Sequence, residues 1–530
     1  MLDRLRNHWT WVGLAVLIGL QLWVQLLWIA ADGGMGEGVC CGFTAPVFDI
    51  LLADATDQLG WPWSHYRQSM GLLVWPALAA RKVFGANPDF LLWMLVTGTV
   101  VSQVLLYDAA RRLAGGVAGL VAAGLYPMLP AVAYMSRRWD AMVPQHWVLI
   151  AAFWFLLQSK SFSRVVPTLG FVAMAMVGCV LSARETDNLL FMAAIGAMAM
   201  GPALRGVLTG RGPLPDDPPH RWRSIAGAVS VAGIMALFCV EYAFPLVDFA
   251  YFQDEMGNKS YERGAARLSA SALLAYPMRL YTDDLTPWLA VPFLAALVHH
   301  IRRGPARAEL WAWFFLPLAA LGFVGKKNFY YAAVIYPVVP IVLGLAVAQW
   351  RPSKVRVPVA VALLVLGWLQ WSARSLPHST FPAELSRVDW TGDLGPQAPL
   401  FQGVVPLNLG PRPGTRHARQ IGLMQSVVTE PSCTCPQHLV VMGQGDFSDM
   451  FLQLKMTDPC LSMSTHPRID HPDSVGWVLE SRARCGADQQ PQVPFGPLRL
   501  HTELPGESGC TKLWSRPINR LCGTRGSPPD

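Results

Sequence analysis

Charged residues are scarce in this chain of 530 residues: 15% are charged, whereas 52% are hydrophobic. Soluble domains typically carry about 25% charged residues, so this composition excludes an ordinary soluble protein for most of the length. A complete dinucleotide-binding fingerprint is also missing, because Gly443-Gln444-Gly445 lacks the remaining glycine. The sequence has no internal repeat of the kind that many transporters contain.

Apolar residues are concentrated in long runs over the first 371 residues. A run of about 20 apolar residues can cross the hydrocarbon core, because a helix satisfies its backbone hydrogen bonds internally. The sequence therefore predicts an α-helical polytopic membrane protein with about eleven transmembrane helices. The predicted spans are 11–30, 90–107, 114–134, 142–157, 165–183, 189–204, 225–244, 288–299, 310–324, 332–350 and 357–371.

The first run follows Arg4 and Arg6 and could be taken for a secretion signal. It is longer than the apolar core of a signal, which has about 7–15 residues, and it contains Gln21 and Gln25. We therefore expect a first helix that is not cleaved.

Basic residues indicate how the helices are oriented. They cluster in every second gap between the runs, as the positive-inside rule predicts for cytoplasmic loops. These clusters are at 4–6, 111–112, 160–164, 205–223, 302–307 and 351–356. The pattern predicts a multi-pass protein of the inner (plasma) membrane with a cytoplasmic N-terminus and an extracytoplasmic C-terminus. Since the net charge of +7 follows largely from this topology, it indicates no nucleic-acid partner.

From residue 372 onward the sequence is rich in proline and polar residues and has no further long apolar run. This part is long enough for a folded domain with its own core. We therefore expect a membrane domain at 1–371 and a periplasmic or extracellular domain at 372–530. Short β-like runs at 439–442, 476–479 and 498–501 predict an α/β or α+β fold for the second domain.

Six of the ten cysteines lie in this second domain, at Cys433, Cys435, Cys460, Cys485, Cys510 and Cys522. An even, clustered set outside the cytoplasm predicts disulfide bonds, although the sequence does not select among the pairings. Cys433 and Cys435 with His438 are an alternative metal site, but their spacing matches no standard zinc site.

Three outer loops carry basic residues where the positive-inside rule does not predict them. They are Arg137 and Arg138, Arg184, and Lys326 and Lys327. Ion pairs with neighbouring acids such as Asp140 and Glu185 are the structural explanation for the arginines. The functional explanation is an anion, because such a set of cations can hold a phosphate or pyrophosphate through charge-assisted hydrogen bonds.

Two more outer loops carry candidate site residues. The first, which begins after residue 30, contains the carboxylates Asp32 and Asp49. The loop predicted at 244–287 mixes charged residues with several tyrosines, among them Tyr276. Tyrosines at this density are typical of a membrane-interface belt and also suit stacking against sugar rings.

Short motifs in these loops resemble the GT-C superfamily of polytopic glycosyltransferases, within it the group of bacterial aminoarabinose transferases of lipid A and protein O-mannosyltransferases. The matching segments are Phe48-Asp49, 68–85, Arg138-Trp139-Asp140-Ala141-Met142-Val143-Pro144, Ala183-Arg184-Glu185, and 327–337, which ends in Tyr336-Pro337. The last match is the strongest. The chain departs from the family pattern at Gln68-Ser69-Met70-Gly71 and at Arg184, where relatives carry a lysine.

The resemblance implies a sugar on a polyprenyl phosphate as donor, a lipid, protein or glycan as acceptor, and an inverting transfer at the outer face. It implies an outer-loop aspartate as general base, Asp49 or its rival Asp32, and Tyr330 and Tyr331 as substrate-binding residues. Arg184, Lys326 and Lys327, with Arg137 and Arg138, would hold the phosphate. Asp140 would orient the acceptor or bind a divalent metal, Mg²⁺ or Mn²⁺, as outer-loop acids do in some relatives.

Two other functions fit the same composition. In a transporter or flippase for an anionic lipid or solute, the outer cations would be substrate ligands, although transporters place essential charges near the bilayer midplane. In a noncatalytic scaffold, Asp49 and Asp32 could both be lost without consequence.

Overall fold

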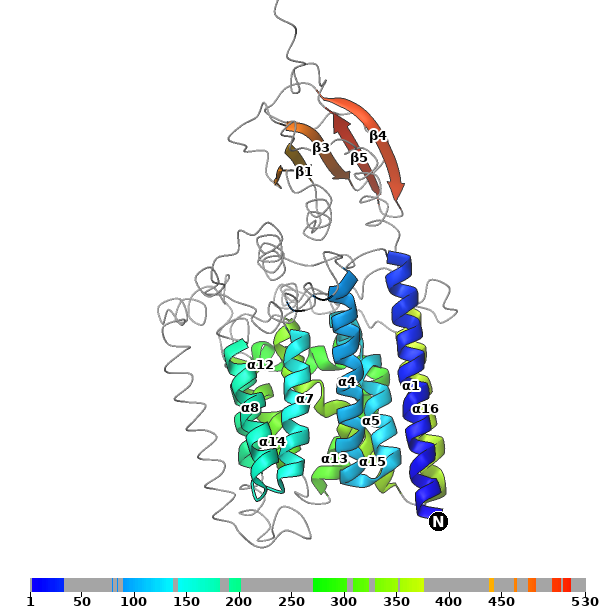
Figure 1. Cartoon of the computed structure of the whole chain (residues 1–530), viewed down its shortest axis with the longest axis vertical. Coiled ribbons are helices and arrows are strands. Elements are labelled where there is room, and N and C mark those ends of the chain that lie inside the picture. Colours follow the sequence, from blue (N-terminus) through cyan, green and yellow to red (C-terminus); the bar gives the residue numbers. More distant parts are fainter. Residues whose placement is uncertain are drawn as a thin grey trace, which may run out of the picture. The chain divides into compact units, whose positions relative to one another are not determined.

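The computed structural model describes residues 2–32, 79, 83, 89–136, 142–181, 190–201, 270–302, 308–323, 329–350, 353–375, 438–442, 462–464, 475–482, 498–506 and 509–515 (Figure 1). The chain divides into two compact units. Unit 1 comprises Met1–Trp28, Trp63–Ala79 and Leu91–Pro413 and holds the helix bundle. Unit 2 comprises Ile29–Pro62, Ala80–Phe90 and Gly414–Asp530 and holds a β-sheet.

The first part of the bundle consists of α1 (Leu2–Asp32), α4 (Asp89–Ala114), α5 (Gly116–Met128), α6 (Pro130–Met135), α7 (Met142–Ser159), α8 (Val165–Leu181) and the apolar helix Leu190–Gly201. The second part consists of α12 (Ala270–Arg279), the π-helical turn η4 (Leu280–Asp284), α13 (Thr286–Arg302), α14 (Ala308–Phe323), the 3₁₀ turn η5 (Phe329–Ile335), α15 (Val338–Gln349), the 3₁₀ turn η6 (Ser353–Val355) and α16 (Arg356–Ser375).

Four described helices are long and apolar enough to cross a membrane: Trp9–Leu26, Trp93–Ala114, Ala332–Gln349 and Ser353–Trp371. All the predicted spans except 225–244 fall on described helices, so the prediction of a helical membrane protein is confirmed. The span 225–244 lies outside the described residues, and the total number of spans stays a prediction. The predicted domain boundary at 371/372 also stays a prediction; α16 itself continues to Ser375.

Two predicted spans, 114–134 and 332–350, are each divided between two helical elements beside a proline. Leu129 has extended backbone angles, φ −60° and ψ 127°, and separates α5 from α6, which begins at Pro130. Tyr336 and Pro337 lie between η5 and α15, and there the backbone stays helical, with φ −63° and ψ −21° at Pro337. The break at Leu129 has a local cause, because proline lacks an N–H group and disfavours helical angles in the residue before it.

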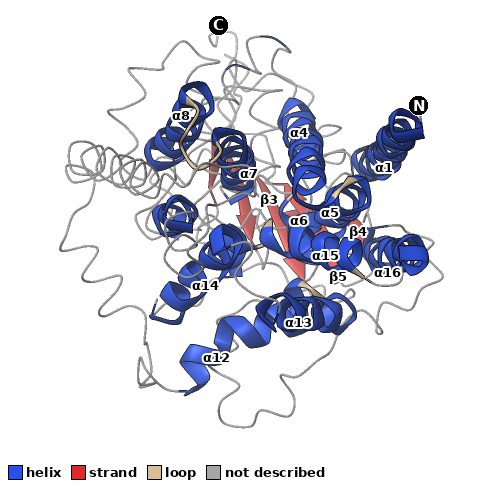
Figure 2. Ribbon diagram, turned by 90° about the horizontal axis from the view of Figure 1, so that it is seen from below, coloured by secondary structure: helices blue, strands red, loops and turns tan. Residues whose placement is uncertain are grey.

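The helix α15 forms the centre of the bundle. Of the span Ala332–Gln349, 89% is buried, compared with 28% of the α1 span and 17% of the α16 span. End-on, α15 lies beside α5, α13 and α16, while α8 packs on α7 (Figure 2). The peripheral helices expose apolar side chains such as Val12 and Val361, as expected for surfaces that face lipid.

Unit 2 contains a five-stranded sheet in the order β2-β1-β3-β5-β4. The strands are β1 (His438–Met442), β2 (Ser462–Ser464), β3 (Val475–Arg482), β4 (Arg499–Gly506) and β5 (Gly509–Ser515). β1 pairs in parallel with β2 and β3, whereas β5 is antiparallel to β3 and β4. The predicted β-like runs fall on β1, β3 and the beginning of β4. Of the six cysteines only Cys510, in β5, is among the described residues, so the disulfides stay a prediction.

The end of the predicted loop at 244–287 differs from the expectation. From Ala270 to Asp284 the chain forms α12 and η4. Tyr276 and Arg279 are each 2% exposed and Asp284 is fully buried. These three residues therefore belong to the interior of the bundle and do not form an interfacial belt. Arg279 and Asp284 can be buried there because they form an ion pair with each other.

Candidate functional site

Most residues of the predicted site lie outside the described part of the chain: Asp49, Asp140, Arg137, Arg138, Arg184, Lys326 and Lys327. Asp32 is the last residue of α1, and Tyr330 and Tyr331 belong to η5. How these side chains meet one another therefore stays a prediction. The structure does define the helix ends that border the predicted loops in the sequence, such as the beginning of α7 and the end of α8.

The helices alternate in direction, so alternate connections share an end. Near the beginning of α1, Thr10 contacts Tyr107 of α4, with 2.6 Å between their hydroxyl oxygens. Towards its other end, Gln25 Nε2 donates to Ser136 Oγ at 3.4 Å. α8 ends and α7 begins at this second end (Figure 1). We call it the outer end, following the topology predicted from the basic residues.

A buried ion pair lies at the junction of α12 and α13. Arg279 Nε donates to Asp284 Oδ1 at 3.0 Å, and the two side chains are 1% and 0% exposed. Between them runs the π-helical turn η4, closed by a hydrogen bond from Leu285 N to Leu280 O at 3.1 Å. Thr286 follows with a positive φ of 58°, an unusual value for a β-branched residue. π-helical turns and strained backbone both concentrate at functional sites.

Tyr336, the tyrosine that ends the 327–337 motif, connects this ion pair with α7. Its hydroxyl interacts with both Arg279 and Asp284. On its other side the Tyr336 ring meets the His146 ring edge-on, with centroids 6.0 Å apart and an interplanar angle of 88°. His146 Nδ1 lies 3.3 Å from the hydroxyl of Tyr126 in α5. We call these five residues the polar cluster: Tyr126, His146, Arg279, Asp284 and Tyr336.

The polar cluster also fixes η5, the turn that contains Tyr330 and Tyr331. The His146 imidazole faces the backbone of Ala333. From α14, Trp313 Nε1 donates to the carbonyl oxygen of Val334 at 2.8 Å. Two neighbouring helices thus hold the backbone of η5 in place. Lys326 and Lys327, which precede η5 in the sequence, lie outside the described residues.

Sequence reasoning missed most of the polar cluster. It included Tyr336 only as part of a motif, and it placed Arg279 and Asp284 in an interfacial loop. Tyr126 and His146 sit within runs that hydropathy marks only as apolar. The usable signal was the presence of ionisable side chains inside membrane spans, where they are rare and often functional.

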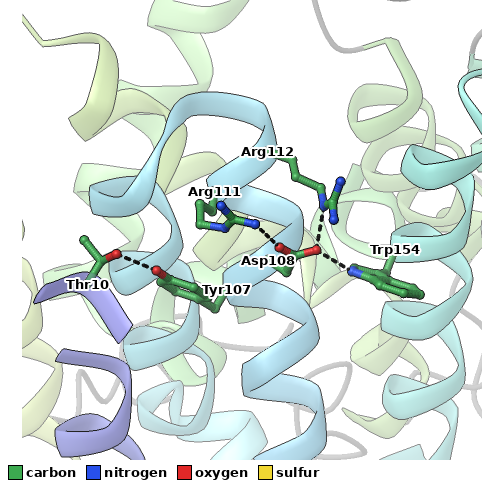
Figure 3. Close-up of polar contacts among 6 residues, drawn as sticks. All are labelled: Thr10, Tyr107, Asp108, Arg111, Arg112 and Trp154. Atoms are coloured by element: carbon green, nitrogen blue, oxygen red, sulfur yellow. Dashed lines mark hydrogen bonds and ion pairs between the residues drawn. The ribbon is translucent and has the colours of Figure 1, made fainter. Parts of the chain in front are cut away.

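A second polar group lies at the opposite end of the bundle (Figure 3). Asp108 accepts hydrogen bonds from Arg111 Nη2 at 2.6 Å, Arg112 Nε at 2.5 Å and Trp154 Nε1 at 2.8 Å. Arg112 is 45% exposed on its side chain. These contacts join α4 to α7 at the end where the positive-inside rule predicts cytoplasm, and they explain Arg111 and Arg112 structurally.

No group of three histidine, cysteine, aspartate or glutamate side chains in the described segments could hold a metal ion. Asp140, the predicted ligand, is outside those segments. The expected divalent metal therefore stays a prediction.

Comparison with known proteins identifies the fold. Residues 72–214 match the family model described as dolichyl-phosphate-mannose-protein mannosyltransferase. The chain is also similar to the crystal structure of ArnT from Cupriavidus metallidurans in the apo state, with a TM-score of 0.54 and 13% identity over 95% of this chain and 97% of that chain. The resemblance to the GT-C superfamily of membrane glycosyltransferases is confirmed.

A structure of the same ArnT bound to undecaprenyl phosphate is similarly related to this chain, with a TM-score of 0.52 and 12% identity over 95% and 98% of the two chains. No curated protein matches by sequence. At this low identity the likeness establishes the GT-C fold, and the roles of individual residues depend on the chemistry of this chain.

Proposed function

We propose that this protein is an integral membrane glycosyltransferase that moves a sugar from a polyprenyl phosphate to an acceptor at the outer face of the inner membrane. The observation that carries the proposal is the fold shared with ArnT over 95% of the chain. The match of residues 72–214 to a mannosyltransferase family supports it. One of the ArnT structures holds undecaprenyl phosphate, which supports a donor built on such a lipid.

In the proposed reaction, an acceptor hydroxyl or amine attacks C1 of the sugar. The new bond to C1 forms as the bond from C1 to the phosphate oxygen breaks, and the configuration at C1 inverts. The acceptor proton passes to Asp49, with Asp32 as the alternative base. The sugar leaves on the acceptor, and the polyprenyl phosphate departs as an anion.

The cations of the outer loops stabilise this departing anion. Arg184, Lys326 and Lys327 are the principal candidates, joined by Arg137 and Arg138. Fixed positive charge acts strongly where water is excluded, because the lower dielectric screens it less. Asp140 orients the acceptor or holds a divalent metal, and Tyr330 and Tyr331 contact the substrate.

The polar cluster supports this assignment from inside the bundle. The contacts of His146 and Trp313 with η5 order the segment that follows the lysine pair. A rigid support of this kind is what an electrostatic site needs, because pre-oriented charges avoid reorganisation during the reaction.

The test is transfer of radiolabelled sugar by the purified protein from a panel of undecaprenyl-phosphate sugars. Asp49→Asn and Asp32→Asn are assayed in parallel, with Asp54→Asn from the same loop as the matched control. Loss of transfer in one of the first two variants alone identifies the base. Assays with EDTA, Mg²⁺ and Mn²⁺ test the metal, and NMR coupling constants of the product test inversion.

Absence of turnover and of lipid binding with every donor would overturn the proposal. Movement of the intact lipid across a vesicle membrane without transfer would instead support a flippase. Full activity in both Asp49→Asn and Asp32→Asn would exclude an aspartate base from this pair.

A further inference from the structure

Within the described segments, the fully buried side chain of Gln145, next to the polar cluster, has no hydrogen-bonding partner. Gln145, adjacent to His146 on α7, is 0% exposed, and neither its Oε1 nor its Nε2 meets a hydrogen-bonding group in the described structure. Leaving such a group unsatisfied costs its full desolvation penalty. Buried polar groups nearly always bond to protein, water or a ligand, so this side chain calls for an explanation.

Neighbouring residues on α7 show which way Gln145 projects. Trp147 faces α4, where its ring lies against Gly98, and Phe155 faces α8, where its ring lies against Gly170. His146 faces Tyr126 and Tyr336. Successive residues turn by about 100° around a helix, so Gln145 projects into the sector between α8 and η5.

The apolar helix Leu190–Gly201 is a further element on this side of the bundle. It packs on α8 through Phe191 against Gly178 and on α14 through Gly201 against Glu309. Gln145 lies only three residues into α7 from Met142, so its sector is at the outer end. Leu181, where α8 ends, and Phe329, where η5 begins, are at the same end.

The chemistry of the carboxamide limits what it can bind. Its oxygen accepts and its nitrogen donates, so a partner that satisfies both must itself donate and accept. The phosphodiester of a lipid-linked sugar offers only acceptors and would leave Oε1 unsatisfied. Sugar hydroxyl groups do both.

We propose that Gln145 binds the sugar of the donor through its carboxamide and helps to determine which sugar is accepted. This inference rests on the proposed glycosyltransferase function. It predicts that Gln145 discriminates between a lipid phosphate that carries a sugar and the same lipid phosphate without one.

The chain provides a matched control in Gln21. This residue lies on α1, is 2% exposed, and both of its amide atoms also find no hydrogen-bonding group in the described structure. It belongs to the peripheral helix of the bundle and not to α7. Gln→Met substitutions at both positions keep the length of the side chain and remove a buried polar group, so neither should destabilise the protein.

The experiment measures equilibrium binding of two lipids to purified full-length protein. The probes are undecaprenyl phosphate and whichever undecaprenyl-phosphate sugar the wild-type protein uses. We expect Gln21→Met to bind both lipids like wild type. Gln145→Met should bind the bare lipid phosphate like wild type and the sugar-bearing lipid about tenfold more weakly, which corresponds to about 1.4 kcal/mol.

Each other outcome has a defined meaning. Unchanged binding of both lipids by Gln145→Met overturns this inference and leaves the proposed function intact. An equal loss for both lipids indicates a phosphate contact or a general defect and also overturns it. If the wild-type protein binds neither lipid, both proposals fail. Should Gln145→Met not fold, Gln145→Asn gives the same comparison, because it keeps the amide but shortens the side chain.

Discussion

Asp284 accepts a hydrogen bond from Nε of Arg279 at 3.0 Å, and both side chains are almost completely buried. The pair spans the π-helical turn η4 and stands next to Tyr336. It therefore connects the helix α12 with the centre of the bundle. Its burial makes the pair costly to disrupt, because removal of one partner leaves the other charge in a medium of low dielectric.

We expect Asp284→Asn to lower the free energy of unfolding by about 3–5 kcal/mol. The matched control is Asp108→Asn at the opposite end, where Arg112 is 45% exposed and water screens the charges. There we expect a loss of about 1 kcal/mol. Thermal unfolding in detergent, followed by tryptophan fluorescence, measures both. Equal losses of stability in the two variants would show that burial does not determine how much the Arg279–Asp284 pair contributes to the free energy of unfolding.

The hydrogen bond from Trp313 to the carbonyl oxygen of Val334 leads us to expect that its removal affects substrate binding as well as stability. Trp313→Phe removes the bond to the η5 carbonyl and keeps a ring to pack on Phe153, whose centroid lies 5.3 Å away. We expect a loss of about 1–3 kcal/mol in stability and a higher KM for the lipid donor, because η5 loses one of the two contacts that hold its backbone.

Trp154→Phe is the control for that prediction. It also removes one indole hydrogen bond, the bond to Asp108 at the opposite end of the bundle. We expect a comparable change in the midpoint of thermal unfolding and an unchanged KM. Steady-state transfer assays distinguish the two variants, and an equal rise in KM in both would contradict a specific role for η5.

Because α15 lies very close to α5 at Gly344, we expect that a single methyl group added at this position destabilises the protein. A Cβ atom added at Gly344 would meet the carbonyl oxygen of Ala118 at 2.5 Å and its carbonyl carbon at 3.2 Å. Because these are backbone atoms, the helices must separate, and we expect Gly344→Ala to destabilise the protein by about 1–3 kcal/mol. The readout is the fraction of monodisperse protein after heating.

Gly19→Ala supplies the comparison for Gly344→Ala. No described atom lies within 4 Å of a Cβ atom at Gly19, so the added methyl group meets no obstacle. Alanine is also favoured over glycine within a helix by about 0.5–1 kcal/mol. We expect equal or greater heat resistance, and a loss similar to that of Gly344→Ala would refute the packing argument.

In unit 2, the buried position of Lys512 leads us to expect that loss of its charge destabilises the sheet. It is fully buried in β5, its Nζ lies 6.0 Å from the centre of the Trp514 ring, and its register partners are Glu480 and Glu503. Lys512→Met removes the cation between two acidic positions. We expect faster cleavage of the second unit by protease, whereas Arg499→Gln, at an exposed position on β4, should leave the rate unchanged.

Much of the fold could be predicted from the sequence because lipid imposes a simple rule. Long apolar runs must be helical to satisfy their backbone groups, and the runs at 11–30, 90–107 and 357–371 fall on α1, α4 and α16. The break at Leu129 was not predicted, although this residue precedes a proline. The short β-like runs of unit 2 fall on β1, β3 and the beginning of β4, because runs rich in apolar and β-branched residues are typical of strands.

The candidate site was less accessible to such reasoning. His146, Arg279 and Tyr336 are separated by more than fifty residues along the chain, and no local pattern indicates that their side chains meet. Hydropathy averages also hide isolated polar residues such as Gln145 within apolar runs.

The sequence by itself determined that this protein is a helical membrane protein with basic residues in alternate loops, because long apolar runs and clusters of charge can be recognised residue by residue. Its short motifs added the resemblance to the GT-C superfamily. Only the tertiary structure decided that Arg279 and Asp284 pair inside the bundle, that Tyr336 connects them with His146, and that Gln145 remains beside them with its amide unsatisfied in the described structure. These relations depend on which helix faces pack together, and that packing is a property of the whole bundle.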